Sequence, residues 1–364
     1  MKKKIESLNS FKVSFYKDEN FDILWKSFLT SYPFYSYRYS RNYIDVEKSQ
    51  IKNKIIDLSF IIHVDDVALC LFPLIIDLEN SYIWYNEFKS IPAPLFNNNL
   101  ENKQIKDLEK ITNDIINKIL TENNIKRWYA LFDPTTYNKY NFNEMYLDRF
   151  RAIDFSCFFS YIDLTTSESI HWNKLRSSYR NLITNGLKFY KFKIYDYKNC
   201  KPELENIYKD LHIKCSGKQN RSDESYKKMF NLVYEKNAII FDQFFKNKRV
   251  QTEIVGLGKK SAIGLSVAND QNFDAKIPLT HSMNYTICNE LRKRGIEKYE
   301  TGYANFEEGL NWITNDKIKK IRFFKKGFGN SNFLMRKWIW FKSRKEELHY
   351  YENQIKKFKE NHNV

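Results

Sequence analysis

Cysteine is scarce in this chain. Its 364 residues include five cysteines, and they are scattered rather than paired: Cys70, Cys157, Cys200, Cys215 and Cys288. Disulfide-stapled domains and zinc modules need closely spaced pairs, so neither class is indicated. His171 and His212 have no plausible partner ligands near them in the sequence. We therefore expect a reduced protein with no metal site and no bound cofactor.

Long apolar runs are also missing. No run approaches the ~18 residues that a membrane-spanning helix needs. The chain begins Met1-Lys2-Lys3-Lys4 and continues with mixed polar residues, a pattern that lacks the apolar middle of a signal peptide. A serine nucleophile elbow, a Walker loop and a dinucleotide fingerprint are likewise absent. These features favour a cytoplasmic protein. They do not indicate a serine hydrolase with a nucleophile elbow, a P-loop nucleoside triphosphatase or a dinucleotide-dependent dehydrogenase.

Aromatic and cationic residues are abundant instead. Hydrophobic residues make up 42% of the chain and aromatic residues 17%, enough for two cores, and the length fits two average domains. The net charge of +16 creates a field that attracts polyanions. Nucleoside pyrophosphates, coenzyme A, transfer RNA and anionic lipid surfaces all fit. Enrichment in Lys, Asn, Ile, Tyr and Phe is also what an AT-rich genome produces, so the charge narrows the partner class without naming it.

The first half has the pattern of a mixed α/β domain. Residues 20–32 predict an amphipathic helix, and residues 58–63 and 67–74 predict a hairpin. Residues 105–120 form the most strongly periodic helix pattern in the chain. A buried strand at 125–132 follows it.

A second unit of this kind begins near residue 155. Residues 172–185 predict one helix that ends at Gly186, with Arg176 and Arg180 one turn apart on its outer face. Residues 238–245 and 250–257 predict a second hairpin, to which residues 262–267 add a strand.

The stretch from 278 to 329 is the most distinctive. Its helix follows Pro278, with Thr280 or Ser282 as candidate caps, and ends in three cations before Gly295. Residues 296–300 predict a strand that returns the chain to a sheet. The stretch closes with Phe324-Lys325-Lys326-Gly327-Phe328-Gly329. The tail after it predicts a charged helix with a thin apolar stripe: Leu348, Tyr351, Ile355 and Phe358.

The two halves share one order of elements. Each reads helix, hairpin, long helix and buried strand, and Ile125 can be laid against Ile296 at an offset of roughly 170–180 residues, which is the size of a domain. Two tandem α/β domains are the economical interpretation.

This organisation resembles the FemAB-related branch of the GNAT N-acyltransferase superfamily, whose members often carry two GNAT domains. The resemblance rests on Trp172, Leu175-Arg176, Arg180 and Ile183 early in the second half and on the segment 324–329 near its end. It spans roughly residues 21–329, and the first half matches only in the order of elements. The implied fold is α/β with mixed sheets. The implied domains are 1–154, 155–341 with the active cleft, and a charged C-terminal helix at 342–364.

One departure from the GNAT pattern concerns coenzyme A. The glycine-containing pyrophosphate loop that normally precedes the central helix is replaced by the residues from Asp274 to Leu279. The loop that normally binds the pyrophosphate of coenzyme A is therefore missing at this position, and the divergent branch commonly lacks that loop.

The candidate catalytic residues follow from the needs of acyl transfer, which are a base and oxyanion stabilisation. The resemblance implies that Lys325, after Phe324, stabilises negative charge; the alternative is one more solvated lysine among sixty Lys and Arg. His281 lies at the start of a helix, where the helix dipole disfavours the charged imidazole, and a neutral imidazole suits a general base. The alternative is a histidine that caps the helix or is simply exposed. Glu300 and Tyr303 end the next strand, where GNAT domains splay two strands, so either is a candidate base.

The candidate substrate-binding residues are Arg176, Arg180 and Phe324. Guanidinium groups match phosphate oxygens, although a solvated basic face explains the two arginines equally simply.

The resemblance implies an acyltransferase that acts on an amine or hydroxyl of a cell-envelope precursor, either a nucleotide-linked sugar or an amino sugar. The donor is acyl-CoA, another thioester or aminoacyl-tRNA, and the lack of an inserted helical arm favours a thioester. The competing interpretations are a nucleic-acid-binding protein and a degenerate GNAT scaffold. The oligomeric state and a peripheral membrane contact of the C-terminal helix stay open.

Overall fold

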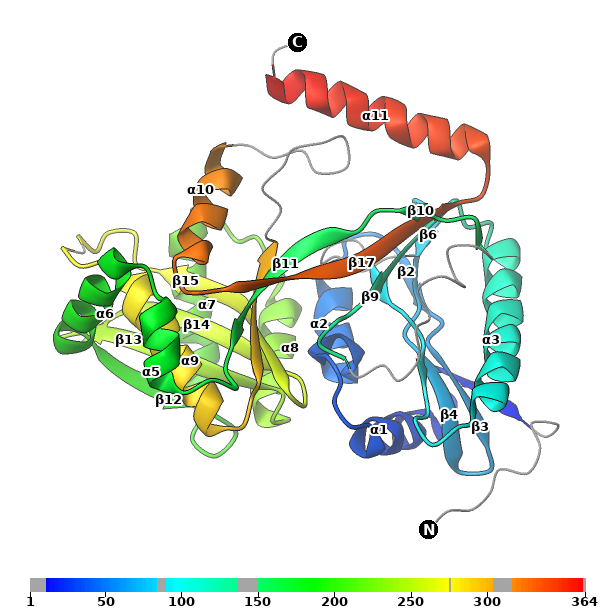
Figure 1. Ribbon diagram of the computed structural model, residues 1–364, viewed down its shortest axis with the longest axis horizontal. Helices are drawn as coiled ribbons and strands as arrows, with labels where there is room; N and C mark the ends of the chain where they lie inside the picture. The colour runs from blue at the N-terminus through cyan, green and yellow to red at the C-terminus, as the bar shows by residue number, and fades with distance from the viewer. Residues whose placement is uncertain (1–10, 84–89, 137–149, 275, 304–315, 363–364) are drawn as a thin grey trace. The chain divides into compact units, whose positions relative to one another are not determined.

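The computed structural model describes residues 11–83, 90–136, 150–274, 276–303 and 316–362 (Figure 1). The chain divides into two compact units. Unit 1 consists of Met1–Pro33, Ile51–Ser156 and Met335–Val364, and unit 2 of Phe34–Gln50 and Cys157–Leu334. Both units are mixed α/β, as the sequence predicts. Among the described residues, no helix combines the length and the apolar character needed to cross a membrane.

Unit 1 contains two groups of strands. Four antiparallel strands pair in the order β1 (Lys12–Phe15), β3 (Phe60–Val64), β4 (Val67–Phe72) and β8 (Leu95–Phe96). The others are β2 (Ile55–Asp57), β5 (Ile75–Asp77), β6 (Tyr82–Ile83), β7 (Ile91–Pro92), β9 (Arg127–Phe132), β10 (Ile153–Asp154) and the C-terminal part of β17 (Ser331–Phe341). The predicted hairpin is β3–β4, and the predicted buried strand is β9.

The helices of unit 1 include, among its described residues, α1 (Phe21–Ser31), α3 (Asn102–Glu122) and α11 (Arg344–His362). The apolar stripe of α3 is buried as predicted, with Leu108 and Ile116 fully covered. The apolar stripe predicted for the tail is only partly covered: Leu348 and Ile355 are exposed, whereas Tyr351 and Phe358 are half-buried. Tyr350 is the buried residue of α11, and its ring packs 5.3 Å from that of Phe341.

Unit 2 is organised around a sheet in the order β12 (Lys191–Tyr195), β13 (Ala238–Phe245), β14 (Lys248–Leu257), β15 (Ser261–Asn269), β16 (Lys298–Tyr303) and β11 (Cys157–Asp163). The pairs are antiparallel except β15–β16, which is parallel. The other elements are η1 (Tyr37–Tyr39), α2 (Arg41–Gln50), α5 (Glu168–Lys174), α6 (Ser177–Phe189), α7 (Glu203–Ser216), α8 (Asp223–Tyr234), α9 (Leu279–Lys293) and α10 (Asp316–Lys326).

Alternation along the strands of unit 2 builds two cores. On β13, Ile239 faces one core with α6 and α9, whereas Ile240 faces the other with α2, α7 and α8. Adjacent strand residues point to opposite faces of a sheet, so both faces are covered by helices. The segment 34–50, early in the chain, belongs to unit 2 through this second core.

The helix predicted at 172–185 is in fact two helices. Leu175 and Arg176 take extended backbone angles between α5 and α6, and the N–H of Arg176 donates to the carbonyl of Gly327 at 2.9 Å. The segment 324–329, which contains Gly327, therefore packs at this break. Periodicity alone missed it, because the apolar residues on both sides keep helical spacing.

Two helix boundaries also differ from the prediction. Gly186 lies inside α6, where a Cβ would come within 2.6 Å of the Ser282 side chain, so it allows α6 and α9 to approach closely. Ser282 is accordingly buried within α9 rather than capping it, and Thr280 is likewise helical. The predicted end of α9 is confirmed, because Gly295 adopts the left-handed φ of +74° just after it.

Candidate active site

The parallel strands β15 and β16 form a fork. Their register covers Ser261–Ile263 against Lys298–Glu300. Beyond that point β15 continues its pairing with β14, and β16 continues its pairing with β11. The two strands therefore separate after Ile263 and Glu300, next to buried charged groups.

Lys325 lies at this fork. It occupies the last turn of α10, and a Cβ on Gly302 of β16 would be 3.0 Å from its Nζ. Gly302 has a φ of +96°, a conformation that glycine adopts without strain. Burial lowers the pKa of Lys325, while the charges of Glu300 and Glu253 act in the opposite direction. The Lys325 side chain thus ends beside Gly302 of β16, where both acids influence its charge.

Glu253, on β14, is the second group at the fork. Its Oε1 accepts a hydrogen bond from the Tyr299 hydroxyl at 3.0 Å. Gly264 leaves room for it, since a Cβ there would be 2.9 Å from the same oxygen. Burial raises the pKa of Glu253 to about 7, against the lowering effects of Tyr299 and Lys325. A carboxyl group with this pKa exchanges protons near neutral pH.

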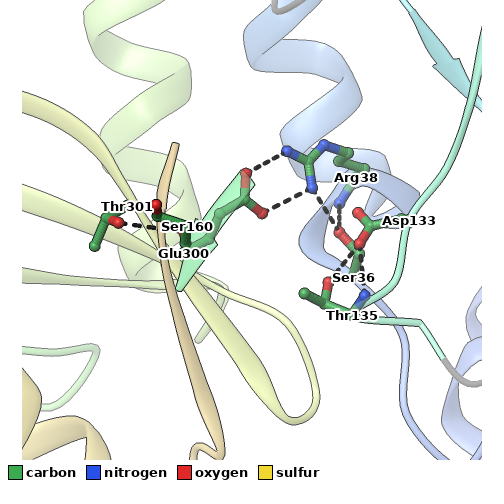
Figure 2. Close-up of polar contacts among 7 residues, drawn as sticks. All are labelled: Ser36, Arg38, Asp133, Thr135, Ser160, Glu300 and Thr301. Carbon is green, nitrogen blue, oxygen red and sulfur yellow. Dashed lines mark hydrogen bonds and ion pairs between the residues drawn. The ribbon is translucent and has the colours of Figure 1, made fainter. Parts of the chain in front are cut away.

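Glu300 is held differently. Figure 2 shows its carboxylate facing the Arg38 guanidinium, which donates to Oε1 at 2.7 Å and to Oε2 at 3.0 Å. Both side chains are 1% exposed. Next to it, Thr301 donates to the carbonyl of Ser160 where the β11–β16 register shifts (Figure 2). Glu300 is thus held by a two-point, charge-assisted contact in the interior.

His281 lies in the first turn of α9 and is buried in an aromatic cluster. Its ring packs 4.4 Å from Tyr179, 5.1 Å from Phe324 and 5.8 Å from Phe328. Its pKa is lowered, as the sequence predicts, but burial is the main cause, followed by the charge of Arg176. Its Nδ1 has no hydrogen-bond partner among the described residues.

Arg176, at the break between α5 and α6, lines a cavity of about 620 Å³. Its guanidinium donates to the carbonyl of Phe323 at 3.2 Å and lies 4.1 Å above that residue's ring. The lining residues are Lys174, Arg176, Lys319, Arg322, Phe323, Lys326 and Gly327. Arg180, one turn further along α6, is partly exposed and is not among them.

Comparison with known proteins identifies the architecture. No protein-family model and no curated protein matches the chain. Among solved structures, FemX matches with a TM-score of 0.66 at 11% identity over 94% of this chain and 100% of its own. L-PGS from Bacillus licheniformis matches with a TM-score of 0.57 at 11% identity, over 92% of this chain and 95% of its own. A tandem GNAT protein from the clavulanic acid biosynthesis pathway matches with a TM-score of 0.52 at 8% identity. The match covers 90% of this chain and 98% of that protein.

The chain shares its fold with FemX and with a tandem GNAT protein. This confirms the fold and the resemblance that the sequence predicts. In this tandem GNAT fold the predicted site residues fall into separate groups. Lys325 and Glu300 lie at the fork, whereas His281 and Phe324 lie in the aromatic cluster, and Arg176 lines the cationic cavity. Tyr303 ends β16 opposite Phe159, and its side chain lies outside the described part of the structure.

The two glycines of the segment 324–329 pack against the α5–α6 break. A Cβ on Gly327 would come within 2.3 Å of the Tyr179 ring, and one on Gly329, which has a φ of +74°, within 2.8 Å of Lys174 Cβ. Between them, the Phe328 carbonyl hydrogen bonds with His171 Nε2 at 3.1 Å. The segment thus fixes the end of α10, from which Lys325 projects.

Sequence reasoning missed Glu253, Tyr299 and Arg38. Glu253 did leave a signal, because it is a lone acid within the apolar strand predicted at 250–257, next to Ile254 and Val255. Arg38 gives no such signal in the sequence, because its partner Glu300 lies 262 positions away.

Proposed function

We propose that this protein is a cytoplasmic acyltransferase. It moves an acyl or aminoacyl group from a thioester or an aminoacyl-tRNA to an amine or hydroxyl of a cell-envelope precursor or surface-glycan sugar. The observation that carries the proposal is the convergence of a lysine ammonium and a carboxyl group with a pKa near 7 at the β15–β16 fork, each beside a glycine. The shared fold with FemX and a tandem GNAT protein supports it.

In the proposed reaction, Lys325 stabilises charge on the donor carbonyl. When the acceptor nitrogen or oxygen attacks the carbonyl carbon, negative charge develops on the carbonyl oxygen. A preorganised ammonium in a partly buried site stabilises that charge more strongly than water does. As the tetrahedral intermediate collapses, the bond from carbon to the donor's sulfur or oxygen breaks.

Glu253 accepts the proton that the nucleophile loses. A base is most effective when its pKa is close to the working pH, because it is then both largely ionised and a useful proton acceptor. The Tyr299 hydroxyl orients the carboxylate, and the pKa of Tyr299 is raised well above its usual value by burial, so the hydroxyl remains a donor. Glu300, which is paired with Arg38, is not the base in this proposal.

The test is transfer of a labelled group by the full chain. Acetyl-CoA and charged transfer RNA are offered as donors, with UDP-linked amino sugars and free amino sugars as acceptors. Lys325→Met is expected to lower kcat by about 10²–10³-fold and Glu253→Gln by about 10²–10⁴-fold. Lys320→Met is the matched control, because Lys320 is an exposed residue of the same helix.

Two results oppose the proposal. Equal activity of Lys325→Met and Lys320→Met would remove the catalytic role of Lys325. No transfer from any donor, together with salt-sensitive binding of random oligonucleotides, would favour the nucleic-acid-binding interpretation.

A further inference from the structure

His171 is a buried histidine of α5 that the proposed reaction does not use. It is 2% exposed, and its ring centroid lies 6.2 Å from that of Tyr285 on α9. Its Nε2 hydrogen bonds with the carbonyl of Phe328 at 3.1 Å. A carbonyl oxygen only accepts, so Nε2 carries the hydrogen and Nδ1 has the lone pair in the neutral ring. The contact with Phe328 thus selects one tautomer.

Phe328 connects this histidine to Lys325. The N–H of Phe328 donates to the carbonyl of Lys325 at 3.1 Å, while the carbonyl of Phe328 accepts from His171. A hydrogen-bonded path therefore runs from the imidazole on α5 to the last turn of α10. Because the Lys325 side chain ends beside Gly302, a shift of this turn moves the ammonium relative to the fork.

Two further contacts hold the same segment and differ in kind. The N–H of Arg176 donates to the carbonyl of Gly327 at 2.9 Å, and the Tyr179 hydroxyl donates to the carbonyl of Phe324 at 3.0 Å. A backbone amide does not titrate, and burial raises the pKa of Tyr179 above its usual value. Of these three contacts, the one from His171 has the donor that titrates closest to neutral pH.

The other nitrogen of His171 faces a cation. Arg292 of α9 brings a guanidinium nitrogen to 3.5 Å from Nδ1, and the same guanidinium donates to the carbonyl of Thr166 at 3.0 Å and to Asn289 Oδ1 at 2.8 Å. A neutral Nδ1 accepts from such a donor. Protonation would place a hydrogen and a positive charge against the guanidinium, so this side of the ring also favours the neutral form.

The charges around the imidazole act in the same direction. Burial is the main cause that lowers the pKa of His171, and the charges of Arg292 and Lys174 lower it further. The hydrogen bond to Phe328 and the charge of Glu168 oppose this. The Glu168 carboxylate already accepts hydrogen bonds from two side chains of α9, at 2.6 and 2.8 Å.

We infer that His171 is a positioning residue for transfer: its neutral imidazole holds Phe328, and through it Lys325, in the orientation that stabilises charge at the fork. The inference rests on the proposed function for its effect on rate. The placement of Lys325 and the tautomer of His171 are measurable without any transfer.

The first experiment is competitive acetylation of the folded full chain with acetic anhydride over a range of pH, read for each lysine by mass spectrometry. Burial lowers the pKa of Lys325 from its usual value of 10.5. His171→Asn, whose short amide does not reach the Phe328 carbonyl, is expected to raise the pKa of Lys325 towards that value. His171→Gln places an amide N–H near the position of Nε2 and is expected to keep it low. His349→Asn, at an exposed histidine of α11, is the control.

Transfer kinetics measure the consequence. His171→Asn is expected to lower kcat by about 10–100-fold with little change in KM, because a displaced Lys325 weakens stabilisation of the transition state rather than substrate binding. His171→Gln is expected to recover most of the rate. A loss in His171→Gln equal to that in His171→Asn would mean that the donor to Phe328 is not what matters, and the inference would fall.

The remaining readouts separate this inference from the proposed function. Nitrogen NMR of the unaltered chain at pH 7 is expected to show His171 neutral with its hydrogen on Nε2, and the opposite tautomer or an imidazolium overturns the inference even if no variant folds. An unchanged pKa of Lys325 in folded His171→Asn overturns it as well. Absence of transfer by the unaltered chain would oppose the proposed function alone, because the acetylation and the tautomer still decide the placement.

Discussion

Glu253 and Glu300 are two buried acids of one sheet with opposite electrostatic settings. Both act on the pKa of Lys325. Glu300 pairs with both arms of the Arg38 guanidinium, whereas Glu253 accepts a hydrogen bond from the Tyr299 hydroxyl and has a pKa near 7. Burial beside a guanidinium gives a carboxylate with a fixed ionic partner. Burial beside a neutral donor gives a group that titrates, which is what proton transfer requires.

The largest expected effect comes from breaking the Glu300 pair. Arg38→Met leaves a buried carboxylate without its guanidinium, and removal of one partner of a buried pair costs about 3–5 kcal/mol. Urea unfolding at neutral pH measures the loss. Arg38→Met/Glu300→Gln is expected to recover much of it, because the uncompensated charge is gone. A single variant as stable as the unaltered chain would show that the pair is not structural.

The Glu253 side of the comparison is tested by the pH dependence of stability. Its pKa is raised from 4.5 to about 7, so the folded state holds a proton that the unfolded state releases between those values. The contribution of Glu253 to stability is therefore greatest below pH 4.5 and is lost as the pH rises to about 7. This difference in pKa between the folded and the unfolded chain corresponds to on the order of 3 kcal/mol.

Glu253→Gln is expected to remove that decline and to be more stable than the unaltered chain above pH 7. Thermal or urea unfolding across this pH range measures it. Glu235→Gln is the control, because Glu235 is an exposed acid of unit 2. Parallel pH curves for Glu253→Gln and the unaltered chain would mean that Glu253 ionises normally.

The fold was largely predictable, whereas the site was predictable only in part. Hairpins, buried strands and the α9 terminus follow from periodicity and capping, which are local in sequence. The α5–α6 break depends on docking of Gly327, and the pairing of Arg38 with Glu300 depends on tertiary contact. The motif singled out Lys325, but the placement of Glu253 depends on its burial beside Gly264, which no local pattern shows.

The smallest expected effects come from replacing the two glycines at the fork. Gly302 lies beside Lys325 and Gly264 beside Glu253, so the two variants test the lysine and the acid separately. Gly302→Ala forces a Cβ into a φ of +96° and to 3.0 Å from Lys325 Nζ, so a stability loss of about 1–3 kcal/mol is expected with a lower kcat. Gly264 does not have a positive φ, and Gly264→Ala acts by displacing the Glu253 carboxylate, 2.9 Å from the new Cβ. It is therefore expected to change the pH profile of kcat more than the stability. If both variants instead lowered kcat equally at every pH, the two glycines would serve only to shape the fork, and the division between a charge-stabilising side and a proton-accepting side would be lost.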